Sequence, residues 1–371
     1  MILLLTLIFI IVTCFYGCMN KTMIKNKKLL IFVFFILLFF ILGGRNYNFG
    51  DNLQYRKNFD VIATLSWSEI IFNSNKEYLQ NILMKIISVL GFGSQSYFYI
   101  SVGISLYGIF KFIIKKSVNM YASILFYISV GTIYTICNIT RQYIAISLIL
   151  LAALAVEENK VFKALFLYFC SIGFHITAII ILPIYLSILF IDKKIKMIQN
   201  KYILFFICSL IGIYLLKPIL EKVFLSSSSD STIANLTSIS QLGKIGQYGA
   251  NTASMIYILL GIFIFIINFY FIDNKNKNFK ILFDSFSQEL YNSFYYIFVI
   301  LGCFSSVLYF RISEYFLPIV IISLANKFIQ TKKVDNNTKL LVMFSFLFLF
   351  IINTLGPNIE YIRNYSFNMF F

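Results

Sequence analysis

Long stretches without a single charged residue recur along this chain. Such runs reach 23 residues and include Ile2–Asn20, Leu29–Gly44, Val118–Thr140 and Tyr202–Leu216. Of the 371 residues, 60% are hydrophobic and only 12% are charged, whereas soluble domains carry roughly a quarter charged residues. Repeated apolar runs of this length predict membrane-crossing helices, because helices satisfy their own backbone hydrogen bonds in lipid. The predicted fold class is therefore an all-α, polytopic integral membrane protein.

The apolar runs divide into about twelve candidate spans. They are 2–19, 29–43, 96–114, 118–138, 141–156, 160–174, 176–191, 202–224, 253–272, 289–308, 312–328 and 339–354. No soluble domain interrupts them, so residues 1–371 are predicted to form a single transmembrane domain. Two connections are long, at about 44–95 and 225–252. Within the first, apolar residues recur at helical spacing over 77–90, which predicts an amphipathic helix lying on the membrane interface.

The basic residues are sorted by type along the chain. Most lysines fall in short clusters between apolar runs, and with twelve spans these clusters all lie on one side. The positive-inside rule identifies that side as the cytoplasm. The net charge of +16 therefore reports membrane topology, and nucleic acid is not an expected partner.

One stretch decides whether this sidedness is consistent. Val161–Ile191 is continuously apolar, and a single crossing would carry the following lysine cluster, 193–201, to the far side. A hairpin broken near Gly173–His175 keeps that cluster inside, and we favour it. Each arm then spans only about 22 Å, so the arms must tilt, be partly re-entrant, or thin the bilayer locally.

The opposite face then receives all of the arginines, the single histidine and two acidic residues. They are Arg45, Arg56, Arg141, Arg311, Arg363, His175, Asp51 and Glu314. The positive-inside rule explains the lysines but not these arginines. A guanidinium presents a planar fork that suits phosphate or carboxylate. This segregation favours an anion-binding site on the face away from the cytoplasm.

Each of these polar groups has an alternative interpretation. Asn138, Thr140, Arg141 and Gln142 open an apolar helix, where an arginine can also snorkel to lipid headgroups. A lone histidine such as His175 is often structural, although its pKa suits proton transfer. Arg311 and Glu314 are spaced i, i+3 and could simply pair with each other on one helix face. Solvated loop charge is the default for Arg56.

These motifs together resemble the EpsG-like, Wzy-type bacterial polysaccharide polymerases. The resemblance spans nearly the whole chain and rests on four groups of residues. They are Arg45, Gly50, Asp51 and Tyr55; Asn138, Arg141, Gln142 and Ala145; Phe174 and His175; and Arg311, Tyr315 and Phe316. Gly50 and Asp51 are adjacent here, whereas the family often has a residue between them.

The resemblance implies a function on the outer face of the bacterial cytoplasmic membrane. Such proteins transfer a glycan on polyprenyl diphosphate to a new lipid-linked repeat unit, lengthening capsule, exopolysaccharide or O-antigen. The expected partners are these lipid-linked oligosaccharides and the bilayer, with a chain-length regulator and a flippase as further candidates. No cofactor and no metal is expected, because arginines can supply the positive charge and the donor bond stores the energy.

The chemistry assigns roles to the residues. Cleavage of the bond to diphosphate puts charge on the leaving group, which Arg141 and Arg311 would stabilise. The acceptor hydroxyl needs a base, for which His175 is the first choice and Glu314 the second. The expected substrate-binding residues are Arg45, Asp51, Tyr55, Asn138, Gln142 and Tyr315.

Other functions remain alternatives at this point. An O-antigen ligase uses nearly the same chemistry, and sugar O-acyltransferases also use Arg and His in polytopic folds. A flippase or transporter of lipid-linked sugar should show repeat symmetry and polar residues throughout the membrane depth. The sequence shows neither feature, since its polar groups gather on one predicted face.

Overall fold

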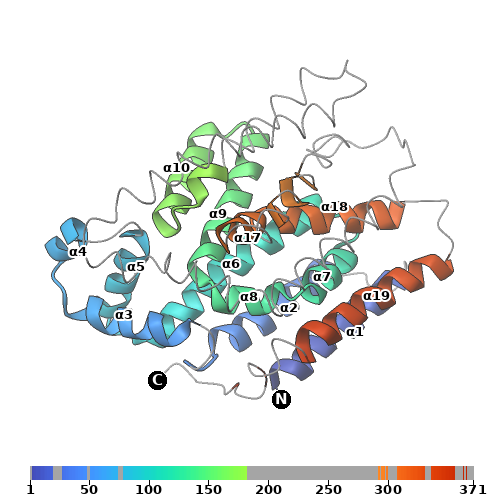
Figure 1. Cartoon of the computed structure of the whole chain (residues 1–371), viewed down its shortest axis with the longest axis horizontal. Helices are drawn as coiled ribbons and strands as arrows, with labels where there is room; N and C mark the ends of the chain where they lie inside the picture. The colour runs from blue at the N-terminus through green and yellow to red at the C-terminus, as the bar shows by residue number, and fades with distance from the viewer. Residues whose placement is uncertain are drawn as a thin grey trace. The chain divides into compact units, whose positions relative to one another are not determined.

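The computed structural model describes residues 2–19, 27–47, 51–73, 78–181, 291–292, 294–296, 298–299, 307–330, 336–355, 362 and 365. The described part is built from α-helices, which confirms the predicted all-α class (Figure 1). The helices are α1 (Ile2–Met19), α2 (Lys27–Gly43), α3 (Asn52–Thr64), α4 (Trp67–Asn73), α5 (Tyr78–Val89), α6 (Ser94–Lys116), α7 (Met120–Ser129), α8 (Thr132–Asn138), α9 (Thr140–Glu157), α10 (Val161–Phe174), α17 (Val307–Ser313), α18 (Leu317–Gln330) and α19 (Asn336–Leu355).

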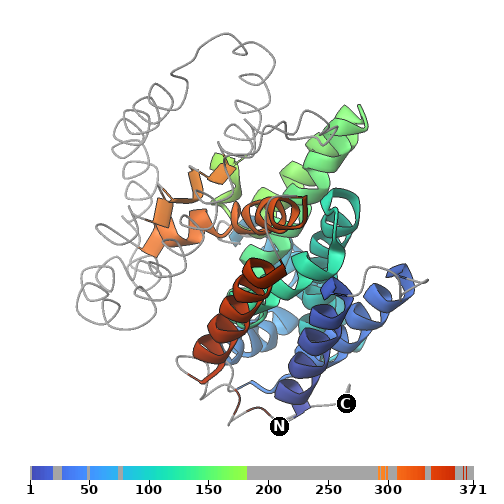
Figure 2. The same ribbon diagram turned by 90° about the vertical axis from the view of Figure 1, so that its right-hand side faces the viewer.

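The chain divides into two compact units. One comprises Met1–Ile184 with Ile321–Phe371, and the other Tyr185–Val320. In the first unit α6 packs against both α2 and α9, and α10 packs against α9. Helices α1 and α19 lie side by side (Figures 1 and 2). The ring centres of Phe15 on α1 and Phe344 on α19 are 5.6 Å apart. The single transmembrane domain over 1–371 stays a prediction.

Several predicted spans coincide with helices. Within the described residues, four helices are long and apolar enough to cross a membrane: Ile2–Met19, Ser94–Lys116, Thr140–Glu157 and Asn337–Leu355. The pair α7 and α8 makes a fifth if it counts as one span. The predicted count of twelve is not confirmed. The spans expected at 202–224 and 253–272 lie outside the described residues, as do most of 176–191 and much of 289–308.

The span predicted over 118–138 is not one straight helix. Helices α7 and α8 meet at an angle of 61°, because Gly131 adopts a left-handed conformation with φ of +85° that ends the first helix. The side chain of Asn353 on α19 donates to the carbonyl of Ser129 at 3.0 Å, which satisfies a group freed by the break. The sequence prediction missed this bend because the apolar run continues through it.

A helix break lies where the hairpin over Val161–Ile191 was predicted to turn, near Gly173–His175, and the hairpin itself stays a prediction. Helix α9 is followed by a short turn containing Asn159, whose φ of 56° is left-handed, and the chain returns along α10. Helix α10 ends at Phe174, and His175 is extended with φ −151° and ψ 119°. Residues 178–181 are helical again, and the remainder of the second arm lies outside the described residues.

The lysines at the end of α6 and Arg141 at the start of α9 lie at opposite ends of this packed helix pair. At the end of α6, Lys116 Nζ is 2.5 Å from the carboxylate of Glu157 at the end of α9, and both side chains are largely buried. Arg141 lies at the start of α9, about 24 Å away at 1.5 Å per residue. The charge segregation inferred from the sequence is therefore present along the helix axes.

Close packing of α6 on α9 depends on Gly108. A Cβ at this position would lie 2.0 Å from Ser147 Oγ and 2.7 Å from the Ser147 carbonyl oxygen. The Ser147 hydroxyl also donates to the carbonyl of Ile104 at 2.6 Å, which ties the two helices together. Small residues allow this approach between membrane helices.

We expect Gly108→Ala to destabilise the protein by about 1–3 kcal/mol, because the Ser147 backbone cannot rotate away from the new methyl group. Thermal unfolding of the purified protein in detergent measures the change. Gly93→Ala is the matched control, since nothing lies within 4 Å of a Cβ there. An equal fall of the unfolding temperature in both variants would contradict this close packing of α6 on α9.

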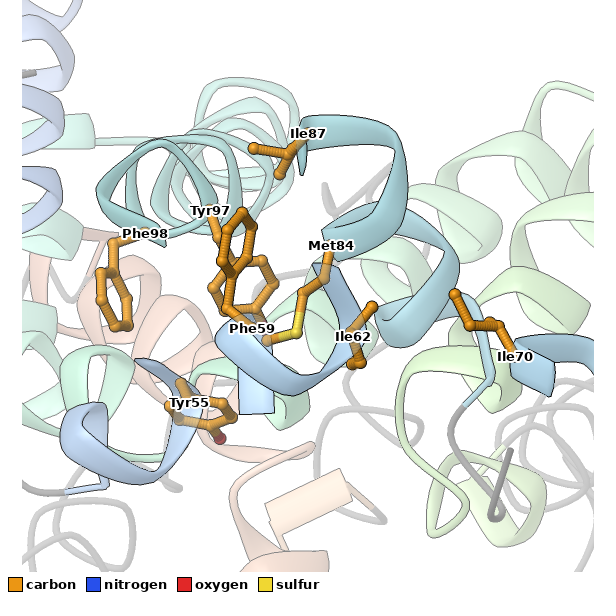
Figure 3. Packing of buried hydrophobic residues seen from close by; sticks show 8 residues of the cluster. All are labelled: Tyr55, Phe59, Ile62, Ile70, Met84, Ile87, Tyr97 and Phe98. Carbon is orange, nitrogen blue, oxygen red and sulfur yellow. The ribbon is translucent and has the colours of Figure 1, made fainter. Parts of the chain in front are cut away.

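The first long connection folds into the helices α3, α4 and α5. A buried cluster joins them to α6, and Figure 3 shows its members, Tyr55, Phe59, Ile62, Ile70, Met84, Ile87, Tyr97 and Phe98. The helix predicted over 77–90 is confirmed as α5, while its place on the membrane interface stays a prediction. Helices α3 and α4 were not predicted. This folded connection supports the end of the bundle where the arginines lie.

Candidate active site

Arg45 holds three elements together at the end of α2. Its Nη1 donates to the carbonyl of Leu42 at 2.7 Å. Its Nε and Nη2 fork onto the side-chain oxygen of Asn52 at 3.3 and 3.2 Å. Nη2 also reaches Thr140 Oγ1 on α9 at 3.0 Å. The guanidinium therefore links the end of α2 to the starts of α3 and α9.

The Arg45 side chain is completely buried. Its guanidinium carbon lies 4.6 Å from the centre of the Phe98 ring, and no carboxylate among the described residues pairs with it. Burial lowers the pKa of the Arg45 guanidinium, but arginine stays charged at neutral pH because its ordinary pKa lies far above neutrality. This end of the bundle thus carries a buried positive charge held only by neutral groups and an aromatic face.

Two further side chains bond to the backbone around Arg45. Gln95, at the start of α6, donates its amide N–H to the carbonyls of Gly43 at 2.6 Å and Arg45 at 3.1 Å. Tyr365, near the C-terminus, donates its hydroxyl to the carbonyl of Ile41 at 2.5 Å. The position of Arg45 is therefore fixed from both its side chain and its main chain.

Helix α3 brings the predicted Asp51 and Tyr55 to the start of α9. The backbone N–H of Asp51 donates to the side-chain oxygen of Asn138 at 3.2 Å. The Asp51 side chain is exposed and makes no capping hydrogen bond to α3. Asn138 thus meets the main chain of Asp51, and the Asp51 carboxylate faces outward from this contact.

Arg141 lies against an aromatic group formed by α3 and α6. Its Nε donates to the hydroxyl of Tyr55 at 3.3 Å, and its guanidinium carbon is 5.4 Å from the centre of the same ring. Tyr55 in turn contacts Tyr97 and Phe98, with ring centres 6.0 and 6.4 Å away (Figure 3). Unlike Arg45, the Arg141 side chain is only partly buried. A partly exposed guanidinium braced by tyrosine is suited to bind phosphate.

His175 lies at the same end of the α9–α10 hairpin as Arg141. The two helices pack together and α10 returns along α9. The 14 residues of α10 place His175 about 21 Å from the turn, within roughly one helical turn of the level of Arg141. Gly173, two residues before it in the chain, packs closely against Leu79 of α5. Gln142, the remaining predicted residue of this group, is buried in α9.

Arg311, Glu314 and Tyr315 belong to the other compact unit. The helix expected to carry the first two, α17, ends at Ser313, so Glu314 and Tyr315 lie in the turn before α18. Arg311 is exposed, whereas Glu314 and Tyr315 are buried. The backbone N–H of Glu314 donates to the Phe310 carbonyl at 3.2 Å, so Glu314 closes the last turn of α17, and its pairing with Arg311 stays a prediction. Arg363 lies outside the described residues.

Sequence reasoning missed Asn52, although a signal for it exists. Asn52, Tyr55, Phe59 and Ile62 are spaced i, i+3, i+7 and i+10, and all are buried on one face of α3. That spacing predicts an amphipathic helix directly after Asp51. We predicted that Asp51 binds substrate, but its neighbour Asn52 is the residue that binds Arg45. Gln95 and Tyr365 carried no comparable signal, because they bond to backbone carbonyls from distant parts of the chain.

Comparison with known proteins decides the family. The family model of EpsG proteins matches residues 28–367, nearly the whole chain. This chain belongs to the EpsG family. EpsG proteins are a Wzy-like polysaccharide polymerase family, so the predicted resemblance is confirmed. No curated protein and no solved structure matches the chain.

Membership of the EpsG family and the apolar helices together establish a multi-pass membrane protein of the polysaccharide-polymerase type. In this EpsG chain, the arginine end of the first unit combines a buried cation, a partly exposed one, aromatic faces and amide groups. That combination can bind a charged phosphate group beside a sugar ring.

Proposed function

We propose that this EpsG protein transfers a growing glycan from polyprenyl diphosphate to a lipid-linked repeat unit on the outer face of the cytoplasmic membrane. The observation that carries the proposal is that Arg45 bonds to Thr140, the residue before Arg141, at the end of α9 opposite the Lys116–Glu157 pair. Arg45 and Thr140, which are 95 residues apart in the chain, meet there through one hydrogen bond.

Arg141 is the proposed contact to the diphosphate. Transfer breaks the bond between the anomeric carbon and the diphosphate oxygen, and negative charge develops on that oxygen. A guanidinium placed there before reaction stabilises the transition state more than the ground state. The Tyr55 ring and hydroxyl both contact Arg141 and help to hold it in place.

Arg45 acts in this proposal as a positioning residue. Its side chain is enclosed and already donates to three neutral acceptors, so it is less suited to direct substrate contact than the sequence suggested. Its bond to Thr140 fixes the residue that directly precedes Arg141. Its unpaired charge also raises the local positive potential, which favours an anionic head group.

The sidedness of the proposal follows from the lysines. Lys115, Lys116 and Lys160 lie at the end of α6 and the turn after α9, and the positive-inside rule assigns such an end to the cytoplasm. The opposite end, with Arg141, then faces outward. A polyprenyl tail can stay in the bilayer while its diphosphate reaches this end. The roles given to Arg311 and Glu314 in the sequence analysis stay predictions, because both residues belong to the second unit.

Analysis of lipid-linked glycans in a deletion strain tests the proposal. Loss of a polymerase should leave single repeat units on the polyprenyl carrier at the outer face, and the wild-type gene should restore long chains. Full-length polymer retained on the lipid would instead indicate a ligase. Single units held on the inner face would indicate a flippase. Either of these two results would overturn the polymerase assignment.

A further inference from the structure

Asp51 is held through its main chain, while its carboxylate is left unengaged. Its backbone N–H donates to the side chain of Asn138 at 3.2 Å, and the next residue, Asn52, is fixed by the buried Arg45. The Asp51 side chain is exposed and does not cap α3, and it forms no ion pair with any residue that the structure describes. The carboxylate therefore has a defined place and accessible oxygens.

The first turn of α3 brings Asp51 close to Arg141. The backbone N–H of Tyr55 donates to the carbonyl of Asp51 at 3.1 Å, so these two residues lie one turn apart on one face of α3. Tyr55 contacts Arg141, and Asp51 contacts Asn138, three residues before Arg141. The first turn of α3 thus lies along the start of α9, and Asp51 and Arg141 lie at the same end of the bundle.

The other carboxylates described in the first unit are placed differently. Glu157 and Glu158 pair with lysines at the opposite end of α9. Glu69 accepts hydrogen bonds from Ser66 just before α4. Asp60 is exposed on α3, about 13 Å farther along the helix axis than Asp51. Among these described residues, Asp51 is therefore the carboxylate that lies beside the start of α9.

The charge of Asp51 decides which substrate it can contact. A carboxylate repels the diphosphate of the donor, which the proposed function assigns to Arg141. The acceptor presents a neutral hydroxyl, from which a carboxylate accepts a hydrogen bond. We infer that Asp51 is the base that removes the proton of the acceptor hydroxyl. This inference rests on the proposed function and gives Asp51 the role first predicted for His175.

The transfer then balances without a further reactant. The acceptor oxygen bonds to the anomeric carbon while its proton passes to a carboxylate oxygen of Asp51. The bond from the anomeric carbon to the diphosphate oxygen breaks, and its electron pair leaves with the diphosphate. The protonated Asp51 returns its proton to water before the next transfer. A positioned base of this kind contributes a factor of about 10² to 10⁴ in rate.

Substitution of Asp51 in the purified protein tests the base role. With a labelled lipid-linked repeat unit in liposomes, we expect Asp51→Asn to lower kcat by a factor of about 10² to 10⁴, with KM and the unfolding temperature unchanged. Asparagine keeps the backbone N–H and the side-chain size but cannot accept the proton. Asp51→Glu keeps the carboxylate and should recover part of the rate. Asp60→Asn is the matched control on the same helix and should elongate like the wild type.

Three results would overturn the base role. They are a wild-type kcat for Asp51→Asn, a raised KM at unchanged kcat, and an equal loss of rate in Asp51→Asn and Asp51→Glu together with lower unfolding temperatures. The second would make Asp51 a binding residue and the third a structural one. In all three the wild type still elongates, so the polymerase assignment stands. A folded wild type that forms no polymer would instead refute the proposed function, and this inference with it.

Discussion

Arg45→Ala is expected to destabilise the protein strongly and to stop glycan elongation. The substitution removes the donor for Asn52 Oδ1, Thr140 Oγ1 and the Leu42 carbonyl in a site without solvent access. A buried polar atom left without its partner costs about 1–3 kcal/mol, so the three together should cost roughly 3 kcal/mol or more. Elongation fails because α9 loses the bond that fixes its first turn.

The measurement is thermal unfolding of the purified protein in detergent, followed by circular dichroism. Arg56→Ala is the matched control, because Arg56 is also an arginine at this end but is exposed and only stacks on Tyr47, 4.3 Å away. It should unfold at the wild-type temperature. The unfolding temperature of Arg45→Lys should lie between those of Arg45→Ala and the wild type, since one ammonium group cannot bond to all of the same acceptors. An Arg45→Ala protein with wild-type stability would contradict the linking role.

Arg141→Ala is expected to leave the fold intact and to abolish polymer. The side chain is partly exposed, and we expect its loss to leave the bundle folded. Removal of one preorganised group that stabilises developing charge typically costs a factor of about 10² to 10³ in rate. Cells carrying the variant should therefore accumulate single lipid-linked repeats, as a deletion strain does.

Polymer length on gels and the amount of protein in the membrane fraction are measured together. Arg56→Ala again serves as the control, because both arginines stack on a tyrosine at the same end of the bundle. Its polymer should have normal length. If Arg141→Ala makes polymer of normal length at the wild-type protein level, Arg141 takes no part in the reaction.

Much of the bundle could be predicted from hydrophobic runs and charge alone. The helices α1, α2, α6, α9 and α19 lie where uncharged runs predicted them. The break before His175 was also predicted, because a single crossing there conflicts with the lysine pattern. These features depend on the solvation of whole segments in lipid, which sequence composition reports directly.

The details that escaped prediction depend on individual contacts. The bend at Gly131 lies inside an uncharged run, so composition does not reveal it. The Ser129 carbonyl that the bend frees accepts a hydrogen bond from Asn353 on α19, a contact that only the tertiary structure shows. For the site, residue types assigned Arg141 and Tyr55 to one site but predicted neither their contact nor the enclosure of Arg45 by Asn52 and Thr140. Burial of a particular side chain depends on tertiary packing, which periodicity within one helix does not give.

Reconstituted transfer tests the central claim most directly. The purified protein in liposomes would be supplied with a labelled polyprenyl-diphosphate-linked repeat unit, without nucleotide. We predict products of two or more repeats, with one polyprenyl diphosphate released for each new glycosidic bond and none formed by Arg141→Ala. A folded wild-type protein that forms no product longer than one repeat, or an Arg141→Ala protein that forms the same ladder as the wild type, would contradict the account.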